Sequence, residues 1–163
     1  MLAAMVIVIS GCNVEGLAFR QDKRLTIIGP GERTEVDLPV TVRWEVKDFE
    51  ITGADGSART DSGRFAVFVD RAPVGPGAPI SDIARNDQQC ARRQGCPDEA
   101  YFNEHRVYFT EETSFTIHTL RDTRPEERPE VRDRHEVVVI LLDGRNVRIG
   151  EAAASTEFFV RRT

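Results

Sequence analysis

The sequence has few cysteines, no excess of positive charge and no apolar run long enough to cross a membrane as a helix. Its 163 residues include 27 acidic and 22 basic side chains, for a formal net charge of −5. Nucleic-acid-binding proteins usually carry a basic excess or a basic face, so this balance argues against that class. The apolar stretch at residues 1–11 is shorter than the roughly 20 residues that a spanning helix needs.

Motifs of common active sites are also missing from the sequence. There is no phosphate-binding glycine loop, no HExxH metal motif and no nucleophile elbow. Gly75-Pro76-Gly77 is interpreted as a turn, because no helix is expected directly after it. No serine or cysteine has a base at a spacing that suggests activation. We therefore predict that the protein is not an enzyme and uses no cofactor.

The apolar N-terminal stretch ends in Ile9-Ser10-Gly11-Cys12, in which an aliphatic residue and two small residues precede a cysteine. This pattern resembles the lipobox of bacterial lipoproteins. The resemblance implies that residues 1–11 are a signal peptide and that Cys12 carries diacylglycerol after cleavage. It also implies a location on the extracytoplasmic side of the bacterial cell envelope, with the lipid as the membrane anchor. The alternative is a buried first strand, MVIVI, that ends at an unrelated Gly-Cys pair.

The remainder of the chain is most simply one domain on a short linker. Residues 12–23 are mostly polar and are predicted to be a tether, and residues 24–163 are predicted to fold as a single unit. If Cys12 is lipid-modified, Cys90 and Cys96 remain as a pair. An even remainder in an exported protein suggests a disulfide, and five intervening residues allow a small loop. The alternatives are half of a metal site, or two free thiols in the cytosol.

Alternation of apolar and polar residues predicts an all-β fold. The clearest strand is 38–47, in which Val40, Val42 and Trp44 share one face. The segment that begins at His135 is apolar on both faces, which places it in the centre of a sheet. The predicted strands are 24–28, 38–47, 64–70, 106–109, 114–120 and the two strands of a hairpin within 135–162.

The hairpin carries further signals. Asp143-Gly144 between two apolar runs predicts a tight turn with positive φ at both residues, and Gly150 predicts an interruption of the returning strand. Together with Gly150-Glu151 and the ending Phe158-Phe159-Val160, this stretch resembles the last two strands of bacterial immunoglobulin-like domains. The resemblance implies an immunoglobulin-like antiparallel β-sandwich of about seven strands. The inter-sheet disulfide of antibody domains is absent, since Cys90 and Cys96 lie in one connection.

Two long connections, residues 72–104 and 121–134, are expected at the same end of the sandwich. An up-and-down path places the start of the first strand at the opposite end, so both connections would point away from the membrane. A short helix over 82–86, capped by Ser81, is predicted in the first connection. In the second, Pro125 and Pro129 exclude a regular helix.

These end loops are predicted to bind a partner, which would be an envelope protein, a surface polymer or a host molecule. Arg92 and Arg93 would contact an acidic partner or lipid headgroups, or else be solvated. Tyr101 and Phe102 would offer an aromatic contact surface, or else anchor the long connection to the sandwich. A second candidate surface is the outer face of Val138, Ile140 and Leu142, unless the long connection covers it.

The three histidines support an alternative function. His105, His118 and His135 each begin or end a predicted strand at the same end of the sandwich. Three imidazoles at one rim are suited to Zn²⁺ or Cu²⁺, which would make the chain a periplasmic metal-binding protein. Exposed, uncoordinated histidines are the other interpretation.

Overall fold

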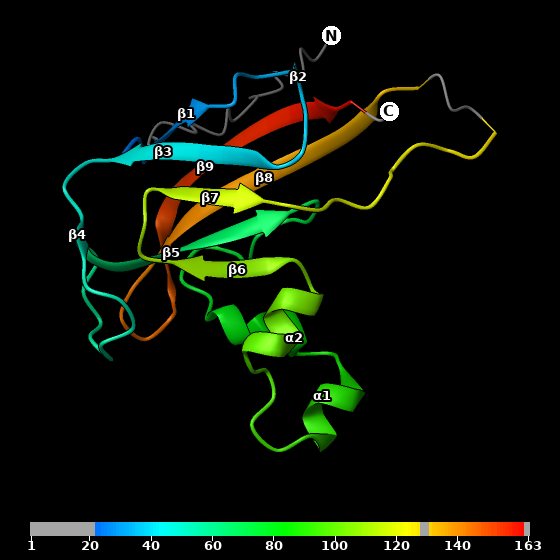
Figure 1. Cartoon of the computed structure of the whole chain (residues 1–163). Coiled ribbons are helices and arrows are strands. Elements are labelled where there is room, and N and C mark those ends of the chain that lie inside the picture. The colour runs from blue at the N-terminus through cyan, green and yellow to red at the C-terminus, as the bar shows by residue number, and fades with distance from the viewer. Residues whose placement is uncertain (1–21, 128–130, 162–163) are drawn as a thin grey trace, which may run out of the picture.

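The computed structural model describes residues 22–127 and 131–161, which form two β-sheets packed face to face (Figure 1). In the first sheet the order is β1 (Leu25–Gly29), β3 (Val40–Val46), β7 (Ser114–Ile117). In the second it is β2 (Thr34–Val36), β9 (Arg148–Val160), β8 (Asp133–Leu142), β5 (Ser62–Val69), β4 (Glu50–Ile51), and β6 (Val107–Thr110) also pairs with β5. This two-sheet order confirms the predicted immunoglobulin-like sandwich.

The first sheet buries one face against the second, as the alternation in β3 predicts. Val42 and Trp44 are buried, whereas Thr41 and Arg43 between them are exposed. Trp44 packs edge-to-face on Phe65 of β5, with 5.4 Å between the ring centroids. This aromatic pair joins the two sheets at the middle of the core.

β8 lies in the centre of the second sheet and is buried on both faces. Val137, Val139 and Leu141 belong to the core between the sheets. Ile140 and Leu142 belong to a second apolar cluster on the outer face. The connection between β5 and β6 supplies the cover for that face, which confirms the interpretation that residues 72–104 fold back over it.

This covering insertion, residues 72–104, contains three short helices: η1 (Ile80–Ala84), α1 (Gln88–Arg92) and α2 (Glu99–Glu104). The prediction that Ser81 caps a helix is wrong: η1 is a 3-10 helix that begins after Pro79 and has no side-chain cap. Asp87 caps α1 and Asp98 caps α2. The Cys90–Cys96 disulfide is present and closes the loop between them, with 5.3 Å between the two Cα atoms.

The β8–β9 connection differs from the predicted two-residue turn. Asp143 accepts hydrogen bonds from the backbone N–H groups of Arg145 and Val147, and the positive φ falls on Asn146 at 64°. The predicted positive φ at Asp143 and Gly144 is therefore wrong. The interruption near Gly150 is a bulge in one continuous strand, because Ile140 pairs with Ala153 while Leu142 pairs with Arg148.

Two short strands were not predicted, and both are parallel to their neighbours. β2 pairs with β9 and β4 pairs with β5. With three and two residues they are too short for a period-two pattern to be recognised. In the described ranges, the structure contains no helix long and apolar enough to cross a membrane.

Candidate functional site

Both long connections start at one end of the sandwich, which we call the loop end. Val69 at the end of β5 pairs with Val137 near the start of β8, and Val107 at the start of β6 pairs with Phe68. The described chain enters at the opposite end, where Leu25 pairs with Val46. The predicted placement of the loops relative to the first strand is therefore confirmed for the described residues.

The two connections differ in how they use the loop end. The projecting connection between β7 and β8, of which residues 118–127 and 131–132 are described, extends away from the sandwich (Figure 1). The covering insertion instead runs back along the outer face, where Pro79 forms a bridge with Val147 of the β8–β9 turn. The expectation that both connections decorate the end is thus corrected: only the projecting connection does so along its length, because the insertion has an apolar face of β8 to cover.

A groove of about 400 Å³ opens at the loop end between β6 and β7, the outermost strands of the two sheets on this side. We call it the edge groove. Residues 115–121 form one continuous wall, and Val69, Arg106 and Tyr108 line the rest. The rings of Tyr108 and Phe115 lie 4.8 Å apart and close the groove from both sheets.

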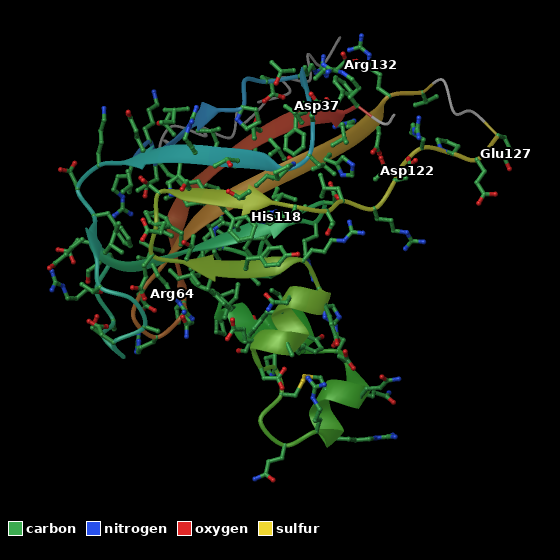
Figure 2. The ribbon with its side chains drawn as sticks, in the orientation of Figure 1. Asp37, Arg64, His118, Asp122, Glu127 and Arg132 are labelled. Carbon is green, nitrogen blue, oxygen red and sulfur yellow. A yellow bond between two sulfur atoms is a disulfide. The ribbon has the colours of Figure 1, made fainter. Side chains whose placement is uncertain are left out.

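The lining of the edge groove is cationic. Arg106, His118 and Arg121 line it, and none of its lining residues is acidic. His118 and Arg121 are exposed. Figure 2 shows His118 where the projecting connection leaves β7, and Asp122 and Glu127 further along that connection. The groove therefore presents positive charge inside a protein whose net charge is negative.

A buried polar network lies directly behind the groove. The Nδ1 atom of His135 is 2.9 Å from Oδ2 of Asp70, and its Nε2 atom is 3.2 Å from Oδ2 of Asp133. Arg106 donates from Nη1 to the same Asp70 oxygen at 2.9 Å. Asp133 also accepts hydrogen bonds from the backbone and hydroxyl of Thr123, both at 2.8 Å. The network thus fastens the projecting connection and a groove arginine to β5 and β8.

The environment of His135 favours its charged form. Burial by itself lowers the pKa of this imidazole, but the carboxylates of Asp70 and Asp133 outweigh burial, and the net effect is a raised pKa. A protonated ring between two carboxylates gives each of them a positively charged partner. Buried charges need such partners, because an unpaired charge is costly to bury. The network is therefore a structural brace whose strength depends on pH.

The structure does not bring the three histidines together. His135 is buried in the network, whereas the ring of His105 stacks on Tyr101 with 4.0 Å between centroids, and His118 faces the groove. Among residues 22–127 and 131–161, no three His, Cys, Asp or Glu side chains are arranged to hold a metal ion. The prediction of a metal site at His105, His118 and His135 is therefore wrong, because each ring belongs to a different local packing.

The residues singled out in the covering insertion have mainly local contacts. Tyr101 and Phe102 are buried in the outer cluster and so anchor the insertion to the sheet, and the Tyr101 hydroxyl donates to Asp87 within the insertion at 3.0 Å. Arg93 pairs with Asp98 at 3.0 Å. Arg92 is exposed at the end of α1. A role of these two arginines in binding a partner stays a prediction.

Sequence reasoning missed the His135 network and the edge groove. A signal for the first was present, because Asp133, His135 and Val137 alternate on one face and continue the buried stripe of β8. No such signal exists for the groove, since it forms where the edges of two different sheets meet.

Comparison with known proteins identifies no family for this chain. No protein-family model matches it, and no curated protein matches it. A solved structure described as fibronectin(III)-like modules of Clostridium thermocellum CbhA is similar, with 10% sequence identity and a TM-score of 0.39. The match covers 84% of this chain and 95% of that chain.

Proposed function

We propose that the protein is a non-catalytic, lipid-anchored binding module on the extracytoplasmic side of the bacterial envelope. Its loop end meets the partner through the projecting connection and the edge groove. The observation that carries the proposal is the position of this groove. It opens beside a charged connection, at the end of the sandwich opposite to the point where the described chain enters.

Two features support the extracytoplasmic address. Disulfides persist in oxidising compartments, and the Cys90–Cys96 pair is bonded. The second is the Ile9-Ser10-Gly11-Cys12 motif, although Cys12, the signal peptide at 1–11 and nearly all of the tether lie outside the described residues. With an anchor at Cys12, a chain that enters at the Leu25 end would hold the loop end away from the membrane.

The internal bracing of the loop end supports a binding role for the projecting connection. Thr123 is fixed by two hydrogen bonds to Asp133, and residues 124–127 are mostly exposed. Arg124 is held by Asp122, with 2.7 Å between Nη2 and Oδ2. A connection that is fastened at its base and exposed beyond it presents charged side chains at a defined place, which reduces the ordering cost of binding.

The lipid anchor and the membrane location are tested by labelling cells with an alkyne-bearing palmitate analogue and separating membranes from the remaining fractions. The wild-type chain should take up the label and sediment with membranes, and Cys12→Ser should do neither. Cys90→Ser is the matched control, since it removes a cysteine that the proposal does not lipidate. Label on Cys12→Ser, or none on the wild type, would refute the lipid anchor.

The contact surface is tested with a photo-crosslinking amino acid placed at single exposed positions. Glu127 on the projecting connection is the test position (Figure 2), and Ala58, exposed before β5 at the opposite end, is its control. Cross-linking in intact envelopes should give a discrete product from residue 127 that unmodified protein competes away. Equal products from both positions would refute the loop end as the binding surface.

A further inference from the structure

We propose that the edge groove binds a protein partner by taking up an extended acidic segment of it as an additional strand along β7. The inference rests on the proposed function, because it names the chemistry of the partner that the loop end meets. Three properties of the groove lead to it: an open strand edge, positive charge that includes Arg121, which is unpaired among the described residues, and an apolar floor.

The wall formed by residues 115–121 includes the open edge of β7. β7 pairs with β3 on one side, and in the described part of the chain no strand lies on its other side. An edge strand directs the N–H and C=O groups of alternate residues away from its neighbour, and a peptide in β conformation satisfies them by strand addition. β7 has four residues, so at about 3.3 Å per residue its edge accommodates roughly 13 Å of extended chain, and residues 118–121 continue the wall without regular secondary structure.

The charge of the groove selects an acidic segment. Arg121 is exposed and has no hydrogen bond or ion pair within the described ranges. Ten other arginines, by contrast, pair with carboxylates. Arg106 uses one N–H on Asp70, and a guanidinium has five. His118 adds an imidazole at the rim, and among the described residues no carboxylate lines the groove to compete for the two arginines.

The floor of the groove adds a preference for alternation in the bound segment. Tyr108 and Phe115 are only partly buried, so parts of their rings, which are tilted by 30° to each other, remain accessible from the groove. Successive side chains of a strand point to opposite sides. A segment with acidic residues at every second position would place its apolar side chains on the rings and direct its carboxylates to the opposite side, where His118 and Arg121 are exposed.

An anionic polysaccharide would satisfy the positive charge but would leave the strand edge of β7 unused. The two kinds of ligand can therefore be distinguished experimentally, because only a peptide supplies backbone N–H groups. Methylation of these nitrogens removes the donors and introduces a clash with the neighbouring strand, and it leaves the charge of the peptide unchanged.

The test uses the full chain in mild detergent and a phage library of random seven-residue peptides. Selected peptides should carry Asp or Glu at alternate positions with β-branched or aromatic residues between them. Arg121→Glu should weaken their binding at least tenfold. Arg92→Glu is the matched control, because it reverses the charge of another exposed arginine far from the groove, and it should leave binding unchanged.

The best peptide is then synthesised in two versions. One carries backbone N-methyl groups at the odd-numbered residues and the other at the even-numbered residues. One version should lose binding at least tenfold and the other should retain most of it, because only one set of N–H groups faces β7. Equal binding of both forms, enrichment without an acidic pattern, or no enriched peptide would overturn the inference. A polysaccharide such as polygalacturonate that binds through Arg121 when no peptide does would identify a charged polymer instead. The cross-linking and lipidation results do not depend on any of these outcomes.

Discussion

The His135 network makes a quantitative prediction that can be examined through Asp70. Asp70 has a positive φ of 53°, a conformation that asparagine adopts with little strain. Asp70→Asn therefore removes the charge and changes the backbone little, which an alanine substitution would not achieve. The variant should be less stable than the wild type, because Asp70 accepts hydrogen bonds from both His135 and Arg106.

The magnitude follows from the burial of each partner. A hydrogen bond between ionised groups contributes about 1.5–3 kcal/mol when it is buried, as the His135 side chain is. The Arg106 side chain is 35% exposed, so its ion pair adds at most about 1 kcal/mol. Because an amide oxygen still accepts one hydrogen bond, the expected loss in the free energy of unfolding is about 2–3 kcal/mol.

The loss should depend on pH with a defined sign. The folded-state pKa of His135 is raised, so the protonated ring stabilises the fold fully below its ordinary pKa of about 6.5. This contribution is lost as pH rises through the folded-state pKa, where the ring becomes neutral. The difference between Asp70→Asn and the wild type should therefore be largest below about pH 6.5 and smaller in alkaline solution.

The assay is urea unfolding at several pH values, followed by the fluorescence of Trp44. This tryptophan is the only one in the chain and is 1% exposed, so its emission reports loss of the core. Asp37→Asn is the control, because Asp37 forms an exposed pair with Arg161 and its loss should cost less than about 1 kcal/mol. If Asp70→Asn is no less stable than Asp37→Asn at pH 6, the brace described above does not exist.

Two further predictions concern the covering insertion and the β8–β9 turn. Reduction of the Cys90–Cys96 bond, or Cys90→Ala with Cys96→Ala, should lower the free energy of unfolding by about 2 kcal/mol, since the closed loop is short. Amide hydrogen exchange should become faster in residues 88–96 and stay unchanged in β3. Equally faster exchange in both segments would contradict a local effect of the disulfide. Gly144→Ala should cost about 1–3 kcal/mol in thermal unfolding, because a Cβ atom there would lie 2.7 Å from the backbone nitrogen of Ser57 and would clash with the Asp55 carboxylate. Gly75→Ala, whose Cβ would meet nothing within 4 Å, should have no effect, and equal losses in the two variants would show that the contact is not tight.

Strands β3, β5 and β8 could be located from the sequence because their signals are local. Alternation in β3 and the doubly apolar run in β8 reflect which faces are buried, and every strand needs such a pattern to hold its register. The Cys90–Cys96 disulfide could also be predicted from the sequence, since only these two cysteines remain if Cys12 is lipid-modified. Local chemistry also misleads: Asp143-Gly144 indicates a two-residue turn, but the Asp143 side chain stabilises a longer one.

The candidate site depends on contacts between segments far apart in the chain. His118 and His135 are both near strand ends in the sequence, yet one faces the edge groove and the other is buried between Asp70 and Asp133. Whether a histidine faces the groove or is buried depends on the residues that the fold places around it. The three-histidine hypothesis failed because sequence positions indicate an end of the fold and not a direction of the side chain.

The sandwich, the central place of β8 and the disulfide could be inferred from the sequence, because each follows from the periodicity or chemistry of adjacent residues. Folding in three dimensions set the remaining features. The folded chain packs the insertion on β8 and brings Asp70, Arg106 and His135 together from three segments. It also forms the edge groove between β6 and β7. The groove exists only because two sheets end side by side, and no run of residues encodes that.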